Sequence, residues 1–307
     1  MKKKIRQKHP FLELFGSIFL KRRLMRVKSE REIITSSQNK YVSLARGLTN
    51  KKNREKEKLF RFDGIKLMCE ALKRGVEISF ILACESEWSL VTEKAEKLYG
   101  VKESDIICPV IFVESSLFER LSEEMAPEGV ICIAKYAENV REITDMCELS
   151  TLPKSEKVLI LESVRDPLNV GAILRVCAAF GVGKVIVSRD CADVYNPKTL
   201  RASMGALFAL SVLKVDSIPE AIGELRRGER RVFAAALDPD SHRLGELKLE
   251  SGDCVVIGNE GHGMSKEAIA ACDGTVFIPM SDGVESLNAA TAAAVLVWEF
   301  FGKEGAI

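Results

Sequence analysis

The spacing of hydrophobic positions changes along this chain and separates a regular C-terminal half from a less regular front. After residue 156, short apolar runs alternate with helical stretches. The runs that are typical of strands are 158–163, 184–188, 231–237, 254–259 and 275–279. Helical spacing covers 171–181 and 286–301. Because continuous apolar runs are typical of strands buried on both faces, the pattern predicts a parallel sheet with helices on both sides over 157–307.

Residues 29–147 predict a smaller α/β domain. Polar start signals precede helical spacing over 34–48, and the pattern over 58–75 indicates a short strand, a turn and a helix. The polar stretch 148–156 carries Pro153 and is typical of a linker between the two domains. Further strands of the front domain are expected at 78–84, 110–113 and 129–136.

Charge is unevenly distributed behind a net charge of +1. Residues 1–60 carry 18 Lys and Arg against 5 Asp and Glu, and the other residues carry 27 against 39. A basic front on an acidic body predicts a polyanionic partner at that end; the alternative is a solvated tail with no partner. Residues 1–28 have ten basic side chains and one acidic one, and we expect them to be a disordered extension.

Cofactor, compartment and membrane signals are few. The apolar stretch 11–20 is too short to cross a bilayer and contains Glu13, so no membrane span is expected, although a helix on a membrane surface stays open. Nine cysteines are dispersed, several of them within apolar runs, which is typical of reduced cysteines in the cytoplasm. His9, His242 and His262 do not stand at metal-ligand spacing, so no metal site is predicted.

Three polar loops follow predicted strands and lead into helical stretches. They cover LESVRDPLNVGAILR (161–175), VIGNEGHGMS (256–265) and IPMSDGVESLNAATA (278–292). Each loop alone has a structural explanation as a turn or a helix cap. Because ligands bind at the carboxyl ends of parallel strands, the recurrence of such loops at this position predicts one shared site.

These three motifs, in this order and at this spacing, resemble the SpoU (TrmH-type) family of RNA ribose methyltransferases. Asn196-Pro197-Lys198 and the stretch 201–206 between the motifs also match that family. The resemblance extends from residue 31 to residue 302. The front half is similar to the family's substrate-binding domain at the basic cluster 51–54, at 60–72 and at 128–136.

The resemblance implies a catalytic domain with a deep trefoil knot that works as a homodimer. Periodicity could not have predicted the knot, because true knots are very rare. The resemblance also implies S-adenosyl-L-methionine as the cofactor, bound at Gly258, Ile278 and Leu287. Glycine lets a backbone approach closely, and Ile and Leu offer apolar surface to adenine. Without the resemblance, core packing is the better explanation of Ile278 and Leu287.

The catalytic positions of the family correspond here to Asn169, Arg175, Glu260, Ser286 and Asn288. Amide and hydroxyl groups can align a ribose hydroxyl and the phosphate beside it. Arg175 is often regarded as the base in this family. Because a guanidinium hardly loses its proton, we expect Arg175 instead to align the target and stabilise developing alkoxide charge. Glu260 is expected to orient Arg175 or another cation.

The function predicted in this way is methyl transfer to a ribose 2′-hydroxyl of structured RNA. Large-subunit ribosomal RNA is the expected substrate, because the chain has a separate front domain. A transfer RNA methyltransferase and an inactive RNA-binding relative are the alternatives. A dinucleotide-binding Rossmann enzyme is excluded, because Gly181-Val182-Gly183 follows a helix and precedes a strand, the reverse of the order that such enzymes need.

Overall fold

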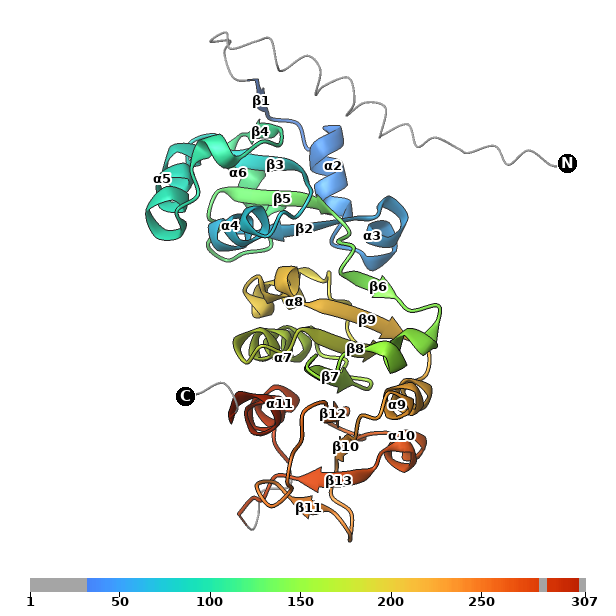
Figure 1. The fold of residues 1–307 in the computed structure, drawn as a ribbon. Coiled ribbons are helices and arrows are strands. Elements are labelled where there is room, and N and C mark those ends of the chain that lie inside the picture. Colours follow the sequence, from blue (N-terminus) through green and yellow to red (C-terminus); the bar gives the residue numbers. More distant parts are fainter. Residues whose placement is uncertain (1–31, 282–285, 304–307) are drawn as a thin grey trace, which may run out of the picture. The chain divides into compact units, whose positions relative to one another are not determined.

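The computed structural model of the chain describes residues 32–281 and 286–303 (Figure 1). The predicted extension, residues 1–28, lies outside the described residues, and so do residues 282–285 of the third polar loop. The described residues build two sheets, a mixed one of five strands and a parallel one of eight strands. The predicted α/β class and the parallel C-terminal sheet are confirmed.

The five-stranded sheet has the strand order β1-β4-β3-β5-β2. Its strands are β1 (Ile33–Ile34), β2 (Leu59–Asp63), β3 (Ile78–Cys84), β4 (Val110–Val113) and β5 (Val130–Lys135). β5 runs antiparallel to β2 and β3, whereas β4 runs parallel to β1 and β3. The helices of this domain are α2 (Lys40–Gly47), α3 (Lys51–Glu57), α4 (Ile65–Lys73), α5 (Trp88–Tyr99) and α6 (Ser115–Leu121).

The strand β2 places a charged side chain, Arg61, in the core of this domain. Phe60 and Phe62 are buried in the hydrophobic cluster, and Arg61 between them is also fully buried. The Arg61 guanidinium donates to both carboxylate oxygens of Asp63 at 2.8 Å and to the Leu121 carbonyl at 3.1 Å. A buried charge is tolerated when it is paired and hydrogen bonded in this way, so Arg61 ties β2 to the end of α6.

The eight-stranded sheet has the order β11-β13-β10-β12-β7-β8-β9-β6, and all of its neighbouring strands are parallel. The strands are β6 (Val140–Glu142), β7 (Val158–Leu161), β8 (Lys184–Ser188), β9 (Ser211–Val215), β10 (Val232–Ala235), β11 (His242–Arg243), β12 (Cys254–Ile257) and β13 (Gly274–Phe277).

Helices cover both faces of this parallel sheet. Successive residues of β7 alternate between two hydrophobic clusters: Leu159 and Leu161 join one, and Val158 and Ile160 join the other. Gly171 explains a close helix pair on the first face, because a Cβ there would stand 2.5 Å from the Thr199 carbonyl oxygen. On the first face lie α7 (Pro167–Ala179), α8 (Pro197–Ser203) and α11 (Ala289–Val297), and on the second lie α9 (Ile218–Arg227) and α10 (Lys266–Ala271).

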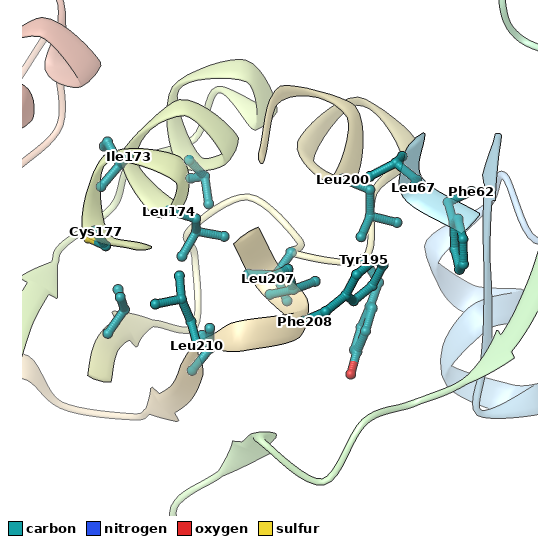
Figure 2. Packing of buried hydrophobic residues seen from close by; sticks show 14 of the residues in the cluster. Phe62, Leu67, Ile173, Leu174, Cys177, Tyr195, Leu200, Leu207, Phe208 and Leu210 are labelled. Atoms are coloured by element: carbon teal, nitrogen blue, oxygen red, sulfur yellow. The ribbon is translucent and has the colours of Figure 1, made fainter. Parts of the chain in front are cut away.

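The two sheets share one core. Figure 2 shows Phe62 and Leu67 of the front domain beside Leu200, Phe208 and Tyr195 of the second. The ring centroids of Phe62 and Phe208 are 5.4 Å apart. Apolar packing of this kind, rather than a flexible linker alone, therefore joins the domains.

Two further features strengthen the junction between the domains. Arg54 on α3 is buried and pairs with Asp193 of the second domain at 2.7 Å. Strand β6, which lies before the predicted linker 148–156, pairs with β9 of the second sheet. The chain thus enters the parallel sheet between Lys135 and Val140. No helix among the described residues is long and apolar enough to cross a membrane.

Candidate active site

The three polar loops leave the carboxyl ends of β7, β12 and β13. β12 is hydrogen bonded directly to β7, so the first two loops start from neighbouring strands. The third loop starts on the far side of β10, and the helix that follows it, α11, packs against α7. The loops therefore meet at one edge of the parallel sheet, as their positions in the sequence predict.

A chain of hydrogen bonds joins the three loops. Asn288 Nδ2 donates to Asn169 Oδ1 at 2.9 Å, and Asn169 Nδ2 donates to Glu260 Oε1. Asn169 comes from the first loop, Glu260 from the second and Asn288 from the third. The structure thus brings together three of the five residues at predicted catalytic positions.

Capping at two helix starts orients this cluster. Asp166 Oδ1 accepts from the Leu168 amide and begins α7, which places Asn169 in its first turn with 8% of the residue exposed. Asn288 Oδ1 accepts from the Ala290 amide and begins α11, so that its Nδ2 remains for Asn169. The same local chemistry that starts each helix therefore aims the amide groups at each other.

The second loop returns sharply on itself. Asn259 and Gly263 exchange two backbone hydrogen bonds of 3.0 and 2.9 Å. A Cβ at Gly258 would stand 2.6 Å from the carbonyl carbon of Gly263, so only glycine permits this return. Asn259 Oδ1 accepts from the Gly261 and His262 amides inside the loop, which fixes its curvature. Gly258 therefore shapes the main chain at its predicted cofactor position.

A second network, which sequence reasoning missed, holds the start of the first loop. Ser163 has a left-handed backbone with φ of 58°, which is uncommon for a residue with a side chain. Its carbonyl accepts from Asn259 Nδ2 at 2.8 Å, its amide donates to Ser188 Oγ at 2.8 Å, and its hydroxyl donates to Asp190 Oδ2 at 2.6 Å. Asp190 also accepts from Ser188 Oγ and from Arg165. An isolated Asp in a turn has no motif, so only the structure reveals this role.

The charge of Asp190 depends on these contacts. Desolvation by burial raises the pKa of its carboxyl group, but hydrogen bonds from Ser163, Ser188 and Arg165 outweigh it, and the pKa lies below the ordinary value. The carboxylate is therefore ionised at neutral pH. It connects the loop after β7 with the loop after β8 and holds the Arg165 guanidinium at 3.2 Å.

Glu162 anchors the other end of the second loop. Its carboxylate accepts from the Ser265 hydroxyl at 2.7 Å and from the Ser265 amide at 2.9 Å, and only 8% of the residue is exposed. Ser265 in turn begins α10 by accepting from the Ala268 amide. Both ends of the second loop are thus tied to the first one, through Ser163 and Glu162.

Among the described residues, no hydrogen bond joins Arg175 or Ser286, both at predicted catalytic positions, to this cluster. Arg175 is exposed, and six positions along α7 place it roughly 120° around the helix from Asn169. No hydrogen bond or ion pair within the described residues joins it to Glu260, whose hydrogen-bond donor is Asn169. Ser286 is also exposed, two positions before Asn288.

Two residues at predicted cofactor positions, Ile278 and Leu287, follow or precede elements at the same edge of the sheet. Ile278 is half-buried and packs against the core at the end of β13, and Leu287 is half-buried just before Asn288. Both residues are only partly buried, so each leaves some apolar surface exposed. No group of His, Cys, Asp and Glu in the described part of the chain could hold a metal ion.

Two family models match this chain. The SpoU rRNA Methylase family matches residues 156–298, and the MRM3-like substrate binding domain matches residues 39–132. The 23S rRNA (guanosine-2′-O-)-methyltransferase RlmB of Bordetella pertussis is 32% identical over 191 residues, which cover 61% of this chain and 75% of that protein. The chain belongs to the SpoU rRNA methylase family. The resemblance predicted from the three motifs is thereby confirmed.

Other relatives resemble this SpoU methylase over most of its length. The 23S rRNA (guanosine(2553)-2′-O)-methyltransferase RlmP of Bacillus subtilis is 27% identical over 269 residues, which cover 88% of this SpoU methylase and 99% of that protein. The SpoU methyltransferase AviRb from Streptomyces viridochromogenes, solved in complex with the cofactor AdoMet, is 25% identical with a TM-score of 0.72. The match covers 88% of this chain and 99% of AviRb, so the similarity includes both sheets.

Proposed function

We propose that this SpoU methylase transfers a methyl group from S-adenosyl-L-methionine to a ribose 2′-hydroxyl of 23S ribosomal RNA. Family membership makes the chain an S-adenosylmethionine-dependent RNA 2′-O-ribose methyltransferase. The ribosomal substrate is supported by the MRM3-like domain at residues 39–132 and by relatives whose names specify 23S rRNA. The observation that carries the proposal is the Asn288–Asn169–Glu260 chain, which joins all three family motifs.

We assign the following roles to the site residues. S-adenosylmethionine supplies an electrophilic methyl group when it is bound. Gly258 shapes the main chain that receives the cofactor, and Ile278 and Leu287 give apolar contact to its ring. Asn169 and Asn288 orient the ribose hydroxyl by hydrogen bonds, with Ser286 beside Asn288 on the same loop.

The charged residues Glu260 and Arg175 have separate roles in the proposal. Glu260 holds the Asn169 amide in place, so that the amide keeps one orientation. Arg175 aligns the phosphate or hydroxyl of the target and stabilises the charge that develops on the 2′-oxygen. As that oxygen bonds to the methyl group, S-adenosylhomocysteine would leave and the hydroxyl proton would pass to water.

Pairing of two copies through α7 and α11 is part of the proposal. Leu168 on α7 is 54% exposed, and Val295 and Trp298 at the end of the chain are 37% and 42% exposed. α7 and α11 pack together, and Phe180 contacts Trp298 with ring centroids 5.4 Å apart. Exposed apolar side chains on two helices that pack together support a self-complementary dimer contact. Arg175 shares the Leu168 face of α7, so a dimer would bring it to the boundary between the copies.

The domain roles and the knot also belong to the proposal. We assign RNA binding to residues 29–147 and catalysis to residues 157–307, connected by 148–156. The knot is supported by the strand order. β12 lies between β7 and β10 in the sheet, although β8, β9 and β10 separate β7 from β12 in the sequence. The cytoplasmic location remains a prediction from the cysteine pattern.

The test uses 23S rRNA from a strain that lacks the gene, incubated with the full chain and methyl-labelled cofactor. We expect label on one ribose, located by its resistance to alkaline cleavage. RNA from the parent strain is the matched control and should accept none, because its site is already methylated. Label on a base, or bound cofactor with no transfer to any RNA, would overturn the proposal; the second result would indicate the inactive RNA-binding relative.

A further inference from the structure

A cavity of about 550 Å³ lies at a junction that none of the three motif loops lines. Its walls come from the front domain, through Lys58 and Tyr136, and from the end of the parallel sheet, through Ser188 and Lys214. This volume falls within the range of small-ligand sites, roughly 300–1,000 Å³. The cavity lies at the carboxyl ends of β8 and β9, on the same sheet edge as the motif loops.

Tyr136 gives the cavity an aromatic wall that is held in place. Its ring stacks on Tyr195 with centroids 4.2 Å apart and an angle of 21° between the planes. Tyr195 is itself buried, and its hydroxyl accepts from the Ala137 amide at 2.8 Å. Tyr136 is only half-buried, so part of its ring remains accessible. Burial is the chief cause that raises the pKa of the Tyr136 phenol, so the ring stays neutral beside an anion.

The charge left over in the cavity is positive. Within the described residues, Lys58 and Lys214 have no carboxylate within 4.0 Å, and Arg141 is neutralised by Glu148. The acidic side chains that line the cavity each have a cation partner: Asp193 pairs with Arg54, Glu55 with Lys51, and Glu142 with Arg189, which it shares with Asp216. Two lysines therefore remain to attract an anionic ligand.

The backbone of Lys58 indicates that its side chain matters. Lys58 ends α3 with φ of 55° and ψ of 34°, a left-handed conformation in which glycine is the unstrained choice. Its carbonyl accepts from the Tyr136 amide at 3.0 Å, and its ammonium lies 5.7 Å from the centroid of the Tyr136 ring. Strained residues of this kind cluster at functional sites. The fold therefore holds a lysine, rather than a glycine, beside an accessible aromatic ring.

We infer that this cavity binds a ribonucleotide of the RNA substrate that flanks the methylated one, with its base stacked on Tyr136 and its phosphates near Lys58 and Lys214. Stacking on an aromatic ring with neighbouring cations is how proteins hold single-stranded nucleotides. Ser188, which lines the cavity, donates to Asp190 and accepts from the Ser163 amide, so the cavity adjoins the first motif loop. The inference rests on the proposed function, because it takes RNA as the substrate.

Binding of an unmodified 23S rRNA transcript to the full chain tests the lysines. Removal of one lysine that pairs with a phosphate should lower the slope of log K against log[salt] by about 0.7. We expect this decrease for Lys58→Gly, which relieves the backbone strain, and for Lys214→Gln. Lys248→Ala, outside the domain assigned to RNA binding, is the matched control, since it removes an exposed charge away from the cavity and should leave the slope unchanged. Unchanged slopes for both cavity variants would overturn the inference.

Tyr136 provides a separate test. Tyr136→Leu should weaken RNA binding between about five-fold and about 150-fold, as for the loss of one base stack. Tyr136→Phe keeps the ring and should bind as the wild type does, so equal affinities for the Leu and Phe variants would refute base stacking.

The outcome is independent of the proposed activity. If the wild type methylates ribose and every cavity variant binds RNA as the wild type does, only the inferred role of the cavity is refuted. If the cavity variants bind RNA more weakly but the wild type transfers no methyl group, only the proposed activity is refuted.

Discussion

Replacing Asn169 by alanine separates a structural role from a catalytic one, because the two roles predict very different magnitudes. The substitution removes two hydrogen bonds, one to Glu260 and one from Asn288. A net hydrogen bond contributes about 1 kcal/mol to stability. Both partners are exposed, so water replaces much of what is lost. Alanine in the first turn of α7 also regains roughly half a kcal/mol of helix propensity. The free energy of unfolding should therefore fall by no more than about 1 kcal/mol.

Turnover should change far more than stability. If Asn169 holds the ribose hydroxyl for reaction, its loss should lower single-turnover methylation about 10²–10³-fold, which corresponds to about 2.7–4 kcal/mol. Asn169→Asp should be equally impaired although its size is unchanged, because a carboxylate oxygen would replace the NH₂ group that donates to Glu260.

The assay combines three measurements: label transfer to unmodified 23S rRNA, cofactor binding by calorimetry, and urea unfolding. Ser217→Ala is the matched stability control, since Ser217 caps α9 and its loss costs about 1 kcal/mol without touching a motif loop. Turnover of Asn169→Ala within a few-fold of Ser217→Ala would refute the reasoning and leave Asn169 as a structural link between helices.

Three other substitutions test the remaining parts of the site. Gly258→Ala places a Cβ 2.6 Å from the Gly263 backbone, so calorimetry should show cofactor affinity reduced at least about tenfold, and an unchanged affinity would separate this loop from the cofactor. Asp190→Asn removes the charge that holds the first loop and should lower turnover about tenfold with little change in folding; wild-type turnover would make the network dispensable. Arg175→Ala should lower turnover by about two to three orders of magnitude with cofactor affinity nearly intact, and Arg175→Lys should recover only part; a matched loss of cofactor binding would place Arg175 in the cofactor pocket.

Periodicity predicted the elements whose pattern is local. The strands at 184–188 and 110–113 agree with β8 and β4 at both ends, and the predicted strand–turn–helix at 58–75 corresponds to β2 and α4. β6 was not predicted, because two of its three residues are charged and its place depends on pairing with β9 about 70 residues away. Such a strand is defined by its neighbour rather than by its own sequence.

In the candidate site, too, the sequence predicts local features but not contacts between distant residues. Loops at the carboxyl ends of parallel strands predict that Asn169, Glu260 and Asn288 converge, and they do. Which atoms would pair could not be predicted, since the partners are 91 and 119 positions apart. The position of Arg175 on the outer face of α7 was also invisible to motif matching, because a motif gives spacing but not the neighbours of a helix face.

The two edge strands of the parallel sheet have a consequence for self-association. β6 and β11 contain three and two residues, and Arg141, Glu142, His242 and Arg243 on them are exposed. A long apolar edge offers unpaired N–H and C=O groups to another chain, and short charged strands remove that template. β6 shields β9, a longer strand with more apolar residues, and it belongs to the segment before the predicted linker. A catalytic fragment that starts at residue 157 would therefore lack β6 and expose the edge of β9, which would make it prone to aggregation.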